Sequence, residues 1–185
     1  MRQGNSMAAQ PDRIAIPAEP ARKRLFEDVT ARCTGLISRI ALSYEADEAL
    51  RRELIQDIML AVWMALPSFR GDSSLKTFVA SIAQKRAITH VTRRAREPRK
   101  VELPEDLHAS GMLPDEIAVR NDLKRQLVNS IQLLPLPQRE AIVLCFEGFS
   151  YTEMGQVLGI STNAAMLRCQ RAKTALKAIM EKDRE

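Results

Sequence analysis

The chain has 185 residues, a length that suits one mid-sized domain or two small ones. Hydrophobic residues make up 45%, aromatic residues only 4%, and there are only 7 glycines, which favours a buried core and argues against an all-β sandwich or barrel. The net charge of +5 is too small to identify a nucleic-acid-binding protein by itself. No apolar run approaches the ~20 residues of a membrane-spanning helix, and the N-terminus lacks the apolar region of a secretory signal. We therefore expect a cytoplasmic protein without membrane insertion.

The chain opens with a polar segment and then becomes helical. Residues 1–21 contain three prolines among small and polar residues, which predicts a flexible N-terminal tail. From Arg22, apolar residues recur at three- and four-residue steps, which predicts an amphipathic helix up to a polar break at residues 43–47. The apolar stripe of this helix comprises Phe26, Val29, Cys33, Leu36, Ile37 and Ile40.

Two further helices are predicted in the first half of the chain. One runs from about residue 47 to residue 66, where Pro67 ends it. Met59 and Trp63 lie beside its core stripe and widen the apolar surface, which fits either a buried core or a docked partner. The next helix runs from about residue 74 to residue 96. Seven Lys and Arg residues stand between residues 85 and 100, which favours a phosphate-contacting surface over a solvated helix end.

A change in composition separates two predicted domains. Residues 97–114 contain three prolines, a glycine and mixed charge, the composition of a linker. Residues 22–96 before it predict one helical domain, and residues 115–185 predict another. In the second domain, one apolar stripe ends at Pro135, and Pro137 opens the next helix, which runs to about residue 147. We therefore predict an all-α fold of two small helical domains joined by a flexible linker.

The strongest local pattern lies near the C-terminus. Ser150 and Glu153 have the spacing of a capping box that opens a short helix, Gly159 makes a turn, and Ser161 can cap the following helix. A short helix, a turn and a longer helix form a helix-turn-helix, whose second helix enters the major groove of DNA. An ordinary helical hairpin with a solvated basic face is the alternative. The side chains suited to base edges and phosphates are Asn163, Gln170, Arg168, Arg171 and Lys173.

Patterns of catalysis and metal binding are missing from the sequence. It contains no Gly-rich phosphate loop, no GxSxG, no HExxH and no titratable cluster at catalytic spacing, so we expect neither an enzyme nor a cofactor or metal. Cys33, Cys145 and Cys169 are far apart in the sequence and form no CxxC pair. Their apolar or helical neighbours favour buried reduced thiols over redox or metal roles.

Two segments resemble a known family. Residues 54–94 read LIQDIMLAVWMALPSFRGDSSLKTFVASIAQKRAITHVTRR and resemble region 2 of bacterial RNA polymerase sigma factors of the extracytoplasmic-function (ECF) group. Residues 134–176 read LPLPQREAIVLCFEGFSYTEMGQVLGISTNAAMLRCQRAKTAL and resemble region 4. The segments keep the order and spacing of the family, and the resemblance covers about residues 22–180. It implies a subunit that binds core RNA polymerase and directs promoter recognition and transcription initiation.

The resemblance also implies three sets of site residues. The family motif Q-[DE]-x-[FM]-L-x-x-W, which docks on the coiled-coil clamp of the largest polymerase subunit, matches Gln56, Asp57, Leu60 and Trp63. The region that binds and helps to melt the −10 promoter element matches Lys76, Thr77, Ser81, Gln84, Arg86, His90, Arg93 and Arg94. Phe78 stands where many members have Trp, and we expect it to pack in the core. The helix that reads the −35 element matches Thr162, Asn163, Met166, Leu167, Arg168, Gln170 and Arg171.

The sequence departs from the family pattern in two places. Members usually carry an acidic D-A-E-D stretch where this chain has Arg51 and Arg52, and two arginines would be repelled by basic residues of the clamp. We hypothesise that core binding needs an activating event, such as a partner or a phosphate on Ser43 or Tyr44, so an anti-sigma factor or a protein kinase is a candidate regulator. The alternative is that both arginines form a solvated helix face. In the recognition helix, residues 163–168 replace the usual G-T-V-K-S-R, which predicts an atypical promoter sequence.

Two other functions compete with this interpretation. A stand-alone helix-turn-helix regulator would bind duplex DNA without polymerase, and would need a dimerisation surface and palindromic sites. A sigma-like protein that only sequesters a regulator is kept open by Arg51 and Arg52. The sequence leaves open whether the two domains pack on each other in the free monomer and hide their DNA-binding surfaces.

Overall fold

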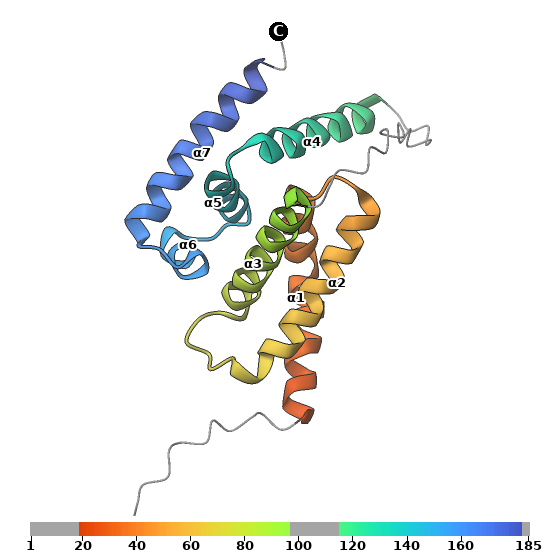
Figure 1. Cartoon of the computed structure of the whole chain (residues 1–185), viewed down its shortest axis with the longest axis vertical. Coiled ribbons are helices and arrows are strands. Elements are labelled where there is room, and N and C mark those ends of the chain that lie inside the picture. Colours follow the sequence, from red (N-terminus) through yellow and green to blue (C-terminus); the bar gives the residue numbers. More distant parts are fainter. Residues whose placement is uncertain (1–18, 97–114, 183–185) are drawn as a thin grey trace, which may run out of the picture.

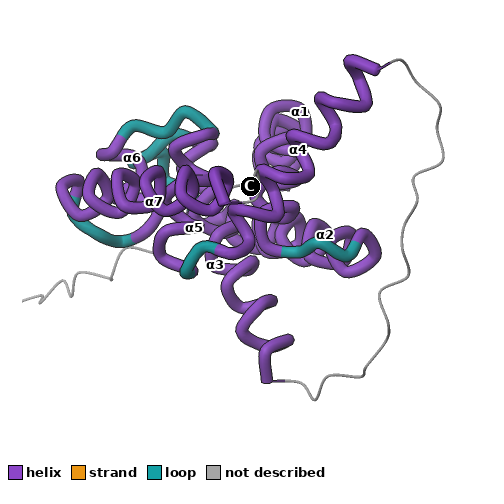
Figure 2. Tube along the Cα trace, turned by 90° about the horizontal axis from the view of Figure 1, so that it is seen from above, coloured by secondary structure: helices purple, strands orange, loops and turns teal. Residues whose placement is uncertain are grey.

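The computed structural model describes residues 19–96 and 115–182, which form helices joined by short loops and contain no strand (Figures 1 and 2). The all-α prediction is confirmed. The first group of helices comprises α1 (Glu19–Tyr44), α2 (Glu48–Ala65), the 3-10 helix η1 (Leu66–Ser68) and α3 (Leu75–Arg96). The second comprises α4 (Asp115–Leu133), α5 (Leu136–Phe146), α6 (Tyr151–Leu158) and α7 (Thr162–Lys182). Among the described helices, none is long and apolar enough to cross a membrane.

The predicted boundaries need one correction at the N-terminus. Helix α1 begins at Glu19, so the last residues assigned to a flexible tail are helical. It also extends to Tyr44 through the start of the predicted polar break, because Ser43 and Tyr44 are both buried against neighbouring helices. The rest of the tail and the whole predicted linker lie outside the described residues.

Helices α1, α2 and α3 pack into one three-helix unit. The fully buried side chains at its centre recur along the helices at the predicted three- and four-residue steps. Ile37, Ile40 and Ile58 are among the largest of them. Asp47 caps α2 by accepting a hydrogen bond from the Leu50 amide at 2.8 Å. Before α3, the Ser74 hydroxyl accepts a hydrogen bond from the Thr77 amide at 3.0 Å.

Helices α4 to α7 form the second unit, and α6 and α7 are the predicted helix-turn-helix. The capping box is present, with the Ser150 side chain accepting from the Glu153 amide and the Glu153 carboxylate accepting from the Ser150 amide. Gly159 ends α6 in the left-handed region at φ 66°, which a glycine adopts without steric cost. Ala165 is fully buried on the packing side of α7, as the pattern predicts.

The two units pack directly on each other and share one continuous core. Helix α3 contacts α6, and α1 contacts α4 and α5, so the second unit lies alongside the first (Figure 1). Polar contacts join them as well, including a hydrogen bond from the Gln132 amide nitrogen Nε2 to the carbonyl oxygen of Leu42 at 2.9 Å. The described part of the monomer is therefore a closed arrangement, a point that the sequence left open.

Candidate nucleic-acid and partner interfaces

The outer face of α2 carries the residues that resemble a polymerase-docking motif. Gln56, Asp57 and Leu60 are exposed, and the Leu60 side chain remains 58% accessible. Met64, one turn further on, is 67% accessible and extends the apolar part of this surface. Exposed large apolar side chains that adjoin polar ones on one helix are typical of a protein–protein contact.

Trp63 differs from the other three because it is half-buried and fixed by α1. Its ring packs edge-on against Phe26, with ring centroids 5.2 Å apart. The guanidinium carbon of Arg22 lies 3.9 Å from the centre of the same ring, and Arg22 Nη2 donates to the Trp63 carbonyl at 2.8 Å. Part of the wide apolar surface of α2 is therefore core, and Leu60 with Met64 is the part that faces solvent.

Arg51 and Arg52 have different surroundings. Arg51 is half-buried, and its Nη1 donates to the carbonyl oxygen of Ala46 at 2.9 Å and to that of Glu45 at 3.4 Å. It thereby satisfies carbonyls just beyond the C-terminal end of α1, a common role for Arg at a helix end. Arg52 is exposed and pairs with Glu48 one turn earlier. Only Arg52 forms the solvated helix face of the alternative interpretation.

Helix α3 leaves five of the eight residues assigned to the −10 element accessible, four of them exposed and one half-buried. Lys76, Arg86, Arg93 and Arg94 are exposed, and Ser81 is half-buried with its hydroxyl donating to the Phe78 carbonyl at 2.9 Å. Phe78 itself packs on Phe69 with ring centroids 4.9 Å apart, which agrees with the predicted packing role. A basic helix face of this kind suits the phosphates of a nucleic acid.

The packed structure buries the other three residues assigned to the −10 element. Thr77 completes the cap of α3, with its amide on the Ser74 hydroxyl. Gln84 is 1% accessible, accepts a hydrogen bond from the Tyr44 hydroxyl at 2.5 Å and donates to the carbonyl oxygen of Glu140 in α5. His90 is 6% accessible. None of these side chains reaches DNA in this arrangement.

His90 belongs to a buried ionic cluster centred on Glu45. Nε2 of His90 lies 2.8 Å from a Glu45 carboxylate oxygen, Arg94 pairs with the same oxygen, and the Asp47 amide donates to the other one at 3.0 Å. Burial pushes the pKa of Glu45 upward, but the hydrogen bonds from His90, Arg94 and Asp47 outweigh it, so the pKa lies below its usual value. Glu45 is therefore a charged structural anchor between α1 and α3.

The two residues considered for phosphorylation are also buried, at 4% accessibility each. The Ser43 hydroxyl donates to the carbonyl oxygen of Ile40 at 2.7 Å. Tyr44 donates to Gln84, and burial raises the pKa of its phenol well above the usual value. Neither hydroxyl is open to a kinase while the two units are packed together.

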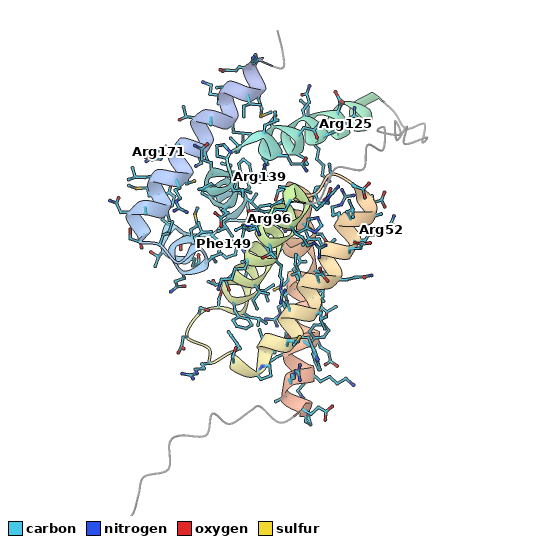
Figure 3. The ribbon with its side chains drawn as sticks, in the orientation of Figure 1. Arg52, Arg96, Arg125, Arg139, Phe149 and Arg171 are labelled. Carbon is cyan, nitrogen blue, oxygen red and sulfur yellow. The ribbon has the colours of Figure 1, made fainter. Side chains whose placement is uncertain are left out.

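Helix α7 presents the residues assigned to the −35 element on its outward side. The exposed members of this set are Thr162, Asn163, Gln170 and Arg171, and Leu167 is 41% accessible. A helix that contacts base edges in the major groove needs such accessible side chains. The half-buried members of the set are Met166 and Arg168. Figure 3 shows Arg171 on the part of α7 that lies away from α1 and α2. The structure thus brings the whole −35 set onto one accessible helix.

The turn after α5 holds the two units together, and the sequence analysis did not single it out. Arg39 of α1 binds the Glu147 carboxylate with both Nε and Nη2, the latter at 2.8 Å, and this hydrogen-bonded pair raises the pKa of Arg39. Lys76 Nζ donates to the Glu147 carbonyl at 2.6 Å and lies 4.4 Å from the centre of the Phe149 ring. Lys76, a candidate for the −10 element, is therefore occupied by the second unit.

An apolar groove of about 540 Å³ also lies where the units meet. Leu42 of α1, Leu127 of α4 and Phe146 of α5 are among its lining residues, and the Phe146 side chain is 54% accessible. Lys124 and the ion pair of Arg39 with Glu147 lie at the same groove. In the described residues, no group of His, Cys, Asp or Glu side chains is arranged to hold a metal ion.

Comparison with known families matches both halves of the chain. The model for sigma-70 region 2 matches residues 30–97, and the model for sigma-70 region 4 matches residues 124–176. The chain is 31% identical to RNA polymerase sigma-H factor of Pseudomonas aeruginosa over 157 residues, which covers 80% of this chain and 79% of the relative. It is also 31% identical to the sigma factor CnrH of Cupriavidus metallidurans over 185 residues, covering 94% and 96%.

Solved structures agree with this comparison. The structure of CnrH in complex with the cytosolic domain of CnrY superimposes with a TM-score of 0.64 at 26% identity, covering 87% of this chain and 90% of that one. The sigma factor RpoE of Bartonella quintana, crystallised with the anti-sigma factor NepR, shares the fold with a TM-score of 0.65 at 20% identity, covering 86% and 98%. The chain belongs to the ECF group of sigma-70 factors and is a promoter-recognition factor of RNA polymerase.

Proposed function

We propose that this sigma factor divides its work among three helices. The α2 surface of Gln56, Asp57 and Leu60 docks on core RNA polymerase, α3 binds the −10 element, and the exposed face of α7 reads the −35 element. The observation that carries this proposal is that the polymerase-docking and −35 sets are accessible on separate helices, one in each matched region. It acts as a non-enzymatic subunit in the cytoplasm, where polymerase and promoters are.

The packed arrangement has a direct consequence for the −10 element. Lys76 is held by Glu147 and Phe149, and Gln84 lies between α1 and α5. Both are therefore unavailable to DNA until the second unit moves away from α3. We infer that the packed monomer is the resting form, and that the activating event separates the two units rather than adding charge beside Arg51 and Arg52.

Two similar solved structures support a protein regulator of this chain. CnrH was solved with the cytosolic domain of CnrY, and RpoE with the anti-sigma factor NepR. We propose that an anti-sigma factor also binds this chain, with an amphipathic helix in the apolar groove between α1, α4 and α5. Leu42, Leu127 and Phe146 offer the apolar contacts, and the nearby Lys124 favours an acidic residue on that helix.

The proposal is tested by binding to purified core RNA polymerase from the same bacterium. Leu60→Ala removes an exposed apolar contact and leaves the core of α2 intact, so we expect at least about a tenfold loss of affinity. The matched control is Leu123→Ala, which truncates a 45% accessible leucine on α4 and should bind like wild type. Trp63 is a weaker choice for this test because its truncation would also disturb Arg22 and Phe26.

The promoter arm of the test uses genomic fragments bound by the reconstituted holoenzyme. We expect the enriched fragments to share two sequence blocks at a constant spacing, and Arg171→Ala to weaken their binding by about tenfold. Palindromic fragments retained without polymerase would instead identify a stand-alone regulator. A chain that binds neither polymerase nor DNA, even after its units are separated, would identify a protein that only sequesters a regulator.

A further inference from the structure

Helix α7 carries a leucine on the side that faces away from the core. Leu167 is 41% accessible, and among the described residues of α7 it is the one large apolar side chain that is exposed. The buried side of this helix carries Ala165, Cys169 and Ala172. Ala165 and Cys169 each stand two residues from Leu167, which at about 100° per residue places Leu167 on the opposite side of the helix. Leu167 is therefore no part of the buried core.

The side chains around Leu167 are suited to a polyanion. Asn163 stands four residues earlier and Arg171 four residues later, and both are exposed, so the three side chains form a row along one face of α7. The Ser161 hydroxyl caps the start of this helix by accepting a hydrogen bond from the Ala164 amide at 3.2 Å. Between residues 162 and 177, α7 carries no carboxylate, and its charged residues are Arg168, Arg171, Lys173 and Lys177. This charge favours DNA as the partner of the row.

A leucine in such a row distinguishes between the bases. Its side chain neither donates nor accepts a hydrogen bond, so it offers van der Waals contact alone. In the major groove, thymine presents a C5-methyl group, whereas the corresponding edge of cytosine, adenine or guanine presents hydrogen-bonding groups without a methyl. An aliphatic side chain gains contact with the methyl group and leaves the polar groups of the other bases without a partner. An exposed leucine at this position therefore favours thymine.

We propose that Leu167 is a specificity-determining residue, which contacts the C5-methyl group of a thymine in the −35 element beside an adenine contacted by Asn163. The inference rests on the proposed function, in which α7 reads that element. The amide of Asn163 matches the N6 and N7 atoms of adenine. Four residues of helix separate the two side chains by about 6 Å along its axis, and stacked base pairs are about 3.4 Å apart. The adenine and the thymine therefore lie within about two base pairs of each other.

The test uses the reconstituted holoenzyme and a promoter fragment that it enriches. Each thymine in the upstream block of the fragment is replaced, one at a time, by deoxyuridine, which keeps the base pair and removes the methyl group alone. We expect one of these replacements to weaken binding about fourfold, the factor that corresponds to about 0.8 kcal/mol for one buried methylene-sized group. Replacements outside the two conserved blocks should leave binding unchanged. Fluorescence anisotropy of the labelled fragments measures the affinities.

Two leucine variants identify the side chain that senses the methyl group. Leu167→Ala should bind the thymine fragment about fourfold more weakly than wild type does, and should bind the thymine and deoxyuridine fragments equally. The matched control is Leu123→Ala, which truncates a 45% accessible leucine on α4 and should keep the fourfold preference for thymine. The deoxyuridine series with the wild-type chain does not depend on the folding of any variant.

The outcomes separate this inference from the proposed function. Suppose that Arg171→Ala weakens promoter binding but no deoxyuridine replacement does, or that Leu167→Ala keeps the preference for thymine. In either case α7 still reads the element, and Leu167 is an ordinary solvated leucine. An upstream block without a thymine also overturns the inference alone. If neither Arg171→Ala nor Leu167→Ala changes promoter binding, the assignment of α7 to the −35 element fails together with the inference.

Discussion

At the scale of single residues, the Glu45 cluster shows how burial changes the role of a side chain. From the sequence, His90 and Arg94 belong to a cationic surface for DNA. In the structure they bind one oxygen of a carboxylate that is 8% accessible, and they tie α3 to the end of α1. A buried carboxylate is tolerated only when hydrogen bonds satisfy it, and Glu45 has three. His90 therefore contributes to the fold of the first unit.

Glu45→Gln is expected to lower the free energy of unfolding at pH 7 by about 2 kcal/mol, because the amide loses the charge-assisted bonds to His90 and Arg94. The pKa of Glu45 is lowered in the folded state, so its stabilising effect is complete above the unfolded-state pKa of about 4.3. It is lost as the pH falls through the lower folded-state pKa. Urea unfolding at several pH values checks this.

The control for this experiment is Asp28→Asn, which removes an exposed ion pair to Arg32 and should cost no more than about 0.5 kcal/mol. The difference in the free energy of unfolding between wild type and Glu45→Gln should become smaller as the pH falls. A difference that stays constant down to the acid limit would contradict the ionic explanation and indicate a loss of packing instead.

At the scale of elements, the helix-turn-helix depends on how closely its turn approaches α6. Gly155 lies inside α6 and is buried, and a Cβ atom there would stand 2.8 Å from the carbonyl oxygen of Ile160. The obstacle is backbone and cannot rotate away. Gly159, at φ 66°, has open space around a hypothetical Cβ. The two glycines are thus required for different reasons. Gly155 is required because a side chain would clash with the turn, and Gly159 is required because its backbone is left-handed.

Gly155→Ala is expected to lower stability by about 3 kcal/mol, because the turn must move away from α6. Gly159→Ala is the matched variant and should cost about 1 kcal/mol, the strain of a left-handed conformation alone. Urea unfolding followed by circular dichroism measures both. Equal losses for the two variants would show that the close approach to Ile160 relaxes without cost.

At the scale of the whole molecule, the packing of the two units controls which surfaces are free. The proposed polymerase-docking face of α2 and the proposed −35 face of α7 remain accessible, whereas part of the proposed −10 set lies under α5 and the turn at Glu147. Each unit has its own helix caps, but the buried core runs through both units, and the Arg39 and Lys76 contacts also cross between them. The interface therefore covers part of the proposed −10 surface and leaves the other two proposed surfaces exposed.

Glu147→Lys is expected to open the packed form, because it replaces the partner of Arg39 with a like charge. Small-angle X-ray scattering should show a larger radius of gyration. Binding to single-stranded −10 DNA should increase by on the order of tenfold, the factor that corresponds to about 1.4 kcal/mol. Glu181→Lys is the control, since it makes the same charge change at an exposed position of α7. An unchanged radius in Glu147→Lys would show that apolar contacts alone hold the units together.

The amino-acid sequence by itself determined the helices, their caps and the family. Apolar periodicity, the Ser150 capping box and the turn at Gly159 are encoded within a few neighbouring residues, so local reasoning predicts them. The docking and −35 sets stay predictions, which the family resemblance assigns because each of its motifs lies within one helix.

Only the tertiary structure decided which residues are free and which distant ones meet. The burial of Gln84 and its hydrogen bond to the carbonyl oxygen of Glu140 depend on how α3 and α5 pack. No periodicity in one segment records such contacts, because they arise from shape and charge complementarity between residues far apart in the chain. For the same reason, the ion pair between Arg39 and Glu147, and with it the closed arrangement of the two units, became visible only in the folded molecule.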